Sequence, residues 1–432
     1  MQPLSRAVLG SRLGRAGLWA VLSHVASEGA RLIRVLVLAR LLAPHDFGLM
    51  GIASLVLACV EVFTEPGLNT ALIQRRGDIR PFLDSVFTIN ATRGAAVSLL
   101  SAALAPMAAA FWDAPRAAWV IAAAGAVVFV RGLSNPATVY LIKDLNFRAV
   151  FWWNLGDTGA ALCTAVACGL LWHNVWALVA SAIVGQAVRT ALSYRLHPFR
   201  PRLRFDWSQC RNLLPFSRWV MATNIVVYLG LRADSALVGR WIGVGALGLY
   251  EMASRIASVP RETLTAVAAE VAFPALSARQ EQAKAMRGVF IRIWVPLLLA
   301  NAAAAFIMVV FPQTLLRILA GKKWSGSAEV LGILAVAQFL RAAAVLPTHY
   351  FYAAGRPNLT FYVNLVRAGV LVVSLGPLAR SFGLNGAALA SLAGASAMTL
   401  AWAIPFLQSW RAAAAINTTG TFKDGVVCEE SR

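Results

Sequence analysis

The chain has 432 residues, of which 59% are hydrophobic and only 13% carry a charged side chain. Soluble globular domains carry about 25% charged residues, so the composition excludes an ordinary soluble protein and indicates a polytopic membrane protein. A net charge of +20 would suggest nucleic acid binding in a soluble chain. In a membrane protein the same charge has to be compared with topology, because cytoplasmic loops carry an excess of Lys and Arg.

Long apolar segments recur along the whole chain and predict an all-α protein with about twelve transmembrane helices. About 20 apolar residues suffice to cross a bilayer, whereas the strands of a membrane barrel have about 9 to 11 residues with alternating polarity, so a barrel is excluded. The segments fall at 17–43, 47–73, 83–111, 117–141, 149–171, 175–195, 213–240, 246–275, 288–312, 327–354, 358–379 and 386–409.

The first segment carries ionisable residues near its middle. Glu28, Arg31 and Arg34 interrupt it, so we expect an uncleaved first helix rather than a signal peptide. An Arg at the centre of such a helix costs roughly 2.5 to 3.5 kcal/mol on insertion scales. Spaced i, i+3, the two arginines lie on one face of the helix. We expect this face to line a water-filled cavity or to contact an anionic partner. Pairing of Glu28 with Arg31 is the simpler structural alternative.

The two halves of the chain repeat each other. A shift of 200 residues matches Arg40, Gly48, Leu49, Ala53 and Ser54 with Arg240, Gly248, Leu249, Ala253 and Ser254. A shift of 210 residues matches Phe129, Arg131, Thr138, Tyr140, Asn154 and Gly159 with Phe339, Arg341, Thr348, Tyr350, Asn364 and Gly369. Each unit has six spans, so a pseudo-twofold axis along the membrane normal should relate them. The predicted parts are a first lobe at 1–196, a basic cytoplasmic linker at 197–212, a second lobe at 213–410 and a polar cytoplasmic tail at 411–432.

Basic residues predict the orientation of the chain. With both ends in the cytoplasm, the cytoplasmic segments contain 20 Lys and Arg residues and the opposite loops contain 5. This asymmetry favours an even number of spans with both termini cytoplasmic.

Signatures of catalysis or metal binding are missing from the sequence. The five cysteines have no CxxC spacing and the five histidines are scattered, so we expect no disulfide framework, metal site or cofactor. Gly243 to Gly248 fits GxGxxG, but that motif binds a dinucleotide only inside a βαβ unit, and here it lies between two apolar segments. No Walker A motif occurs, and the loops are too short for a catalytic domain. We therefore expect a protein that is not an enzyme.

Charged residues inside the spans are the functional candidates. An arginine-rich cavity suits a hydrated anionic head group, above all a diphosphate, because Arg binds phosphate oxygens bidentately. The structural alternative is ion pairing within the membrane: Arg232 with Asp234 or Glu262, and Arg367 with Asp157. The candidate diphosphate contacts are Arg31, Arg34, Arg131, Arg232, Arg255 and Arg341, and the candidate coupling-ion ligands are Glu61, Asp157 and Asp234.

A set of short motifs runs along the chain: ARLLAPHDFGL at 39–49, GLNTALIQ at 67–74, FTIN at 87–90, LGLY at 247–250 with Arg255 and Pro260, FPAL at 273–276, WSGSA at 324–328 and AGRP at 354–357. As a set, they resemble bacterial oligosaccharide flippases of the Wzx and WzxC types, within the multidrug/oligosaccharidyl-lipid/polysaccharide exporter superfamily. The resemblance implies two six-helix lobes that form a V and alternate between inward and outward openings. It implies transport of an undecaprenyl-diphosphate-linked oligosaccharide across the bacterial inner membrane, for exopolysaccharide, O-antigen or capsule assembly.

Three other functions remain open at this stage. A cation-coupled multidrug exporter of the same superfamily would need an acid-rich cavity, whereas arginines dominate here. A membrane polymerase or ligase would need a hydrophilic catalytic loop. A structural role in a polysaccharide assembly complex is the third. The expected partners are the lipid-linked oligosaccharide, membrane lipid and polysaccharide polymerase or export proteins, with no nucleic acid.

Overall fold

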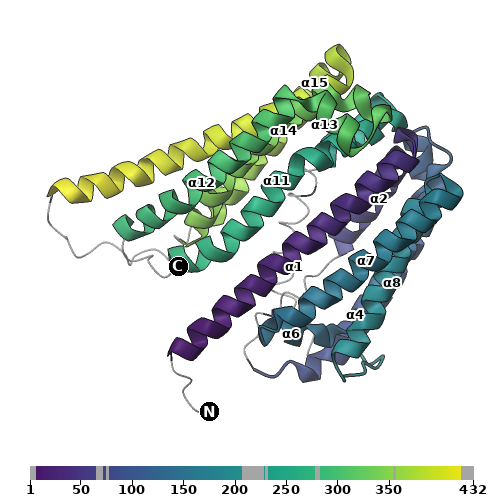
Figure 1. The fold of residues 1–432 in the computed structure, drawn as a ribbon, viewed down its shortest axis with the longest axis horizontal. Helices are drawn as coiled ribbons and strands as arrows, with labels where there is room; N and C mark the ends of the chain where they lie inside the picture. Colours follow the sequence, from purple (N-terminus) through teal and green to yellow (C-terminus); the bar gives the residue numbers. More distant parts are fainter. Residues whose placement is uncertain are drawn as a thin grey trace.

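The computed structural model describes residues 6–64, 72–73, 77–206, 228, 232–277, 283–353 and 357–419. Parts of the predicted linker, of the span at 213–240, of the tail and of the motifs at 67–74 and 354–357 lie outside these ranges. The described residues form helices and turns without strands. Figure 1 shows two groups of helices that meet at one end of the molecule and separate towards the other, in the shape of a V.

The first bundle contains the N-terminal helices. They are α1 (Arg6–Leu41), α2 (Pro44–Thr64), α4 (Arg80–Phe111), α5 (Ala117–Gly132), α6 (Val139–Lys143), α7 (Phe147–Trp172) and α8 (Trp176–Leu196). Between α5 and α6 the chain passes through a 3-10 helix, η1 (Pro136–Thr138), and the two limbs of this span are bent by 66°. The break follows from Asn135, which is extended because Pro136 comes next, and whose side chain accepts a hydrogen bond from the backbone N–H of Ala137.

The second bundle begins with a helical segment at 232–241. It continues with α11 (Val244–Ser277), α12 (Ala283–Val310), α13 (Pro312–Leu319), a 3-10 helix η2 (Lys322–Ser327), α14 (Ala328–Ala353) and α15 (Pro357–Thr419). A reversal interrupts α15 at Gly383, whose φ of 57° is left-handed. Beyond it, Gly394 packs against the carbonyl oxygen of Arg367, so α15 is a hairpin that corresponds to the two predicted spans at 358–379 and 386–409. Its second limb continues to Thr419, beyond the expected end of the lobe at 410.

Several helices are suited to a membrane. In the part of the chain that the structure describes, seven are long and apolar enough to cross one, or eight when the bent α5–α6 pair counts as one span. One of the seven is the 45-residue apolar stretch Leu359–Ala403 of the α15 hairpin, which is about twice the length that a single crossing requires. The fold is therefore that of a polytopic membrane protein, and the number of twelve spans stays a prediction.

The bundles touch where the α1–α2 turn meets the start of α11, and we call this the closed end. A Cβ atom on Gly48 would lie 1.9 Å from the carbonyl oxygen of Val244, and one on Gly248 would lie 1.8 Å from that of Pro44. The two helices α2 and α11 thus cross in backbone contact that only glycine permits. Residues 44 and 48 correspond to 244 and 248 under the 200-residue shift, so the contact is reciprocal, as in a twofold interface.

A tryptophan reinforces the closed end. The indole Nε1–H of the fully buried Trp324 donates to the carbonyl oxygen of Ala39 at 2.9 Å, and its ring meets Phe47 edge-on with centroids 5.1 Å apart. Arg40 donates to the carbonyl oxygen of Ile318 at the same end. These hydrogen bonds join side chains of each bundle to the backbone of the other and stabilise their contact.

Candidate functional site

Glu28 joins the two bundles through an ion pair that involves cations from both. Its Oε1 lies 2.5 Å from a guanidinium nitrogen of Arg31, and its Oε2 lies 3.7 Å from one of Arg255 on α11. The expected Glu28–Arg31 pair is confirmed. The two arginine side chains remain 41% and 39% exposed, so one carboxylate leaves both guanidinium groups with free hydrogen-bonding capacity.

Arg34 extends this cationic group along the first helix. It is half-buried and lies within the electrostatic range of Arg31, Arg255 and Asp157. The structure thus brings together three of the six predicted arginines from both bundles, with Glu28 paired to Arg31 and Arg255 and with Asp157 near Arg34. A cationic excess of this kind between apolar helices requires an anionic partner.

Asp157 pairs with Arg189, a residue that the sequence analysis did not select. The Nη1 atom of Arg189 lies 3.2 Å from Asp157 Oδ2 and donates to Asn154 Oδ1 at 2.8 Å. The Arg189 Cζ atom lies 4.1 Å from the centroid of the Trp153 ring. The expected pairing of Asp157 with Arg367 is therefore wrong. Arg189 also lies within range of the charges of Arg31 and Arg131, so it continues the basic inner side of the first bundle.

Arg131 and Arg341 occupy equivalent places in the repeat but have different partners. Arg131 pairs with Glu61 of α2 at 2.8 Å and is 52% exposed. Arg341 donates to Ser391 Oγ at 2.7 Å, and its Nε is buried without a hydrogen-bond partner among the described residues. The two positions that the repeat predicts to be equivalent therefore have different surroundings.

A buried polar network lies inside the second bundle, around Asp234. This side chain is 6% exposed and accepts hydrogen bonds of 2.8 Å from the Tyr250 hydroxyl and from the backbone N–H of Ser235. The positive charges nearby belong to Arg341 and to Arg367, which is only 3% exposed. Asp234 is thus compensated by internal arginines.

Arg232 has a different partner from either of those expected. It lies 3.6 Å from Glu251, whereas Glu262 pairs with Arg261 at 3.1 Å and Asp234 accepts from Tyr250. The predicted pairing of Arg232 with Asp234 or Glu262 is therefore wrong. Arg232 also lines a pocket.

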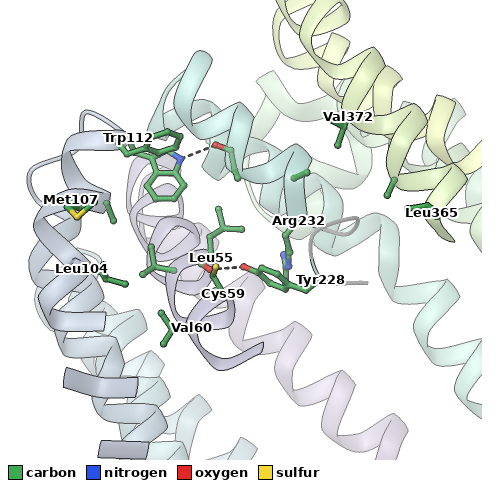
Figure 2. Close-up of a pocket in the computed structure, with 16 residues that line it drawn as sticks. Leu55, Cys59, Val60, Leu104, Met107, Trp112, Tyr228, Arg232, Leu365 and Val372 are labelled. Atoms are coloured by element: carbon green, nitrogen blue, oxygen red, sulfur yellow. Dashed lines mark hydrogen bonds between the residues drawn. The ribbon is translucent and has the colours of Figure 1, made fainter. Parts of the chain in front are cut away.

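That pocket has a volume of about 810 Å³ and lies between the bundles (Figure 2). Two hydrogen bonds cross from bundle to bundle beside it: Tyr228 Oη donates to the carbonyl oxygen of Leu55 at 2.6 Å, and Trp112 Nε1 donates to that of Ala236 at 2.9 Å. The wall is apolar apart from Arg232, which is the one charged residue among the described lining side chains. These are Leu55, Val56, Cys59, Val60, Leu104, Met107, Ala108, Phe111, Trp112, Tyr228, Arg232, Ala233, Ala236, Leu365, Ala368 and Val372.

Metal ligands do not gather in the described part of the chain, where no three His, Cys, Asp or Glu side chains come together. The GxGxxG stretch from Gly243 to Gly248 forms a turn and the start of α11. Its last glycine provides the close contact with Pro44, so packing between the bundles accounts for this residue.

Solved structures with the same arrangement of helices are transporters of lipids and drugs. The lipid II flippase MurJ in its inward closed conformation superposes with a TM-score of 0.74 at 14% identity, covering 94% of each chain. An inward-facing multidrug resistance MATE family transporter of the MOP superfamily gives a TM-score of 0.69 at 13% identity, covering 91% of this chain and 96% of that one. At these identities the likeness shows the fold alone.

Sequence relatives belong to polysaccharide biosynthesis. The succinoglycan biosynthesis transport protein ExoT of Rhizobium meliloti is 24% identical over 351 residues, which are 81% of this chain and 71% of that protein. The lipopolysaccharide biosynthesis protein WzxC of Escherichia coli is 24% identical over 376 residues, 85% of this chain and 76% of that protein. A family model described as "Polysaccharide biosynthesis protein" matches residues 37–329. Since that match covers more than half of the chain, the protein belongs to this family of polysaccharide biosynthesis proteins.

Proposed function

We propose that this protein moves a lipid-linked oligosaccharide from one leaflet of the membrane to the other by alternating access. The observation that carries the proposal is the pairing of Glu28 with Arg31 and Arg255 where the bundles face each other, with Arg34 within electrostatic range of both arginines. Membership in the family and the likeness to relatives named as transport proteins and flippases support it. A substrate with a diphosphate between lipid and sugar supplies the anion that these arginines lack.

The head group crosses between the bundles while its lipid chain stays in the bilayer. Arg31 and Arg255 exchange the carboxylate of Glu28 for phosphate oxygens, to which guanidinium groups bind bidentately. When the substrate leaves, Glu28 pairs again with Arg31 and Arg255, and its ion pair with Arg255 joins the two bundles. No bond in the substrate is made or broken, so the activity is transport without catalysis.

The distribution of basic residues in the sequence predicts the orientation of the chain in the membrane. The ratio of 20 to 5 Lys and Arg residues favours cytoplasmic termini, and the relatives from polysaccharide biosynthesis support an inner-membrane location. Movement from the cytoplasmic to the outer leaflet then delivers the glycan to polymerase or export proteins. Glu61, Asp157 and Asp234 remain the candidate ligands for a coupling proton or cation, which would have to displace Arg131, Arg189 and Tyr250 respectively from these carboxylates.

A cation-coupled drug exporter is the competing function, and the MATE fold is compatible with both. A cationic drug would be repelled by the arginine excess around Glu28, so the charge of the interface favours the lipid-linked anion.

Reconstitution in liposomes tests the proposal. We expect the wild type to move a fluorescent polyprenyl-diphosphate oligosaccharide between leaflets, and an Arg31→Ala/Arg34→Ala variant to be at least tenfold slower. Arg116→Ala/Arg317→Ala is the control, because it removes the same charge from two exposed positions. A wild type that moves cationic dyes but not the lipid-linked glycan would support the drug exporter, and equal rates for the two double variants would remove the arginine pair from the mechanism.

A further inference from the structure

The pocket beside Arg232 has an exposed apolar rim. Along its rim, Met107 is 72% exposed, Val372 52% and Leu365 49%, whereas Leu55 and Val60 at its base are 5% and 7% exposed. In a membrane the exposed rim contacts hydrocarbon. We infer that the pocket is an indentation of the lipid-facing surface, formed by α2 and α4 on one side and by Tyr228, Arg232, Ala233, Ala236 and α15 on the other (Figure 2).

Arg232 places a positive charge deep in the membrane at this indentation. The helical segment that carries it ends at Trp241, so at 1.5 Å per residue Arg232 lies roughly 13 Å from that end. The hydrocarbon core is about 30 Å thick, which puts the guanidinium near its middle. A resident phospholipid keeps its phosphate at the membrane surface, so a phosphate that reaches Arg232 belongs to a lipid whose head group is crossing.

The guanidinium of Arg232 is available to such a phosphate. Its nearest carboxylate is Glu251, and their N–O distance of 3.6 Å is longer than a hydrogen bond. The Arg232 side chain is 48% exposed, and Figure 2 shows it next to Tyr228 at the pocket. An apolar wall with one under-coordinated cation at mid-depth matches the two ends of a prenyl diphosphate.

We propose that at one stage of crossing, when Arg232 rather than Arg31 and Arg255 binds the diphosphate, this pocket holds the first isoprene units of the polyprenyl chain, so that the lipid tail lies between α4 and α15. The inference rests on the proposed function and adds a binding site for the tail. The volume of about 810 Å³ lies within the range of about 300 to 1,000 Å³ for ligand pockets.

Photo-crosslinking in liposomes tests where the tail lies. Benzoylphenylalanine is placed at Leu365 on the rim, with Leu299 of α12 as a control that is 66% exposed outside the pocket. We expect an adduct with the mass of the polyprenyl-diphosphate oligosaccharide at position 365, at least tenfold more than at 299, and reduced at least fivefold by Arg232→Gln. Adducts with phospholipid alone, or equal yields at both positions, would overturn the proposal.

Filling the pocket gives a second measurement on the same liposomes. Ala108→Trp places an indole inside the pocket, whereas Ala102→Trp adds the same group to the exposed part of α4 outside it. We expect Ala108→Trp to slow movement between leaflets at least tenfold and Ala102→Trp to leave it within twofold. If the wild type moves the lipid and the two variants move it at equal rates, the tail site alone is overturned. If the wild type moves no lipid, the proposed function is overturned as well.

Discussion

Substituting Gly48 with Ala should open the closed end of the protein. The new Cβ would lie 1.9 Å from the carbonyl oxygen of Val244, whereas ordinary contacts begin at 3.4 Å. Helices α2 and α11 must therefore separate by about 1.5 Å, the difference of the two distances. Overpacking of this kind costs about 1 to 3 kcal/mol, and only the conformation with the closed end bears that cost.

The expected effect is a shift between conformations. At 1.4 kcal/mol for each factor of ten, the ratio of closed to open molecules falls by about 5-fold to 150-fold. Gly245→Ala is the matched control, because it adds the same methyl group to the same helix where nothing lies within 4 Å.

Distances between spin labels measure this shift. In a variant without the five cysteines, labels at the exposed positions His45 and Lys322 report the separation of the bundles at the closed end by pulsed electron paramagnetic resonance. We expect a longer distance to dominate in Gly48→Ala and the wild-type distribution in Gly245→Ala. Identical distributions in the two variants would refute the reasoning, since the backbone contact would then not limit the approach of the bundles.

Three further predictions concern charged residues inside the apolar helices. Glu28→Gln leaves Arg31 and Arg255 without their carboxylate, so a polyprenyl diphosphate should bind several-fold more tightly in detergent, as measured by fluorescence anisotropy, while movement between leaflets slows. Weaker binding would contradict the exchange of carboxylate for phosphate. Arg189→Leu removes the partner of Asp157 and should lower the thermal midpoint of unfolding in detergent, because hydrogen bonds to charged groups contribute about 1.5 to 3 kcal/mol. If the lost pair is the cause, adding Asp157→Asn to the same chain should partly restore the midpoint. Asp234→Asn should abolish any dependence of transport on a sodium or proton gradient if Asp234 is the coupling ligand, and an unchanged dependence would leave it a structural partner of Tyr250.

The path of the chain could be predicted largely from the sequence. Apolar segments of membrane-spanning length anticipated the helices, and the gap between 379 and 386 anticipated the reversal at Gly383. The repeat predicted that residues 44–48 and 244–248 are equivalent. It did not predict that they touch each other, because internal symmetry relates positions without stating which surfaces meet at the axis.

The ion pairs of the candidate site were harder to predict from the sequence than the path of the chain, because they depend on which helix face carries each side chain. Glu28 and Arg31 are three residues apart and share a face, so their pair could be predicted. Arg232 and Asp234 are two residues apart, a spacing that puts their side chains on different faces, and this should have excluded their pairing. Asp157 and Arg189 lie at equal distances from the turn at His173, which ends α7 in a left-handed conformation, so the antiparallel hairpin of α7 and α8 could have revealed their pair.

The glycine contact at the closed end also determines how far the opposite ends of the bundles move when the bundles rotate by a given angle. A pivot made of backbone lies close to the helix axes, and the first helix has 36 residues, so at 1.5 Å per residue it forms a lever arm of roughly 54 Å. A tilt of about 10° at Gly48 and Gly248 would then displace the far ends of the bundles by roughly 9 Å relative to each other, by the same helix rise. Gating of one leaflet thus requires little rearrangement at the pivot, because the length of the helices amplifies a small rotation into an opening as wide as a sugar.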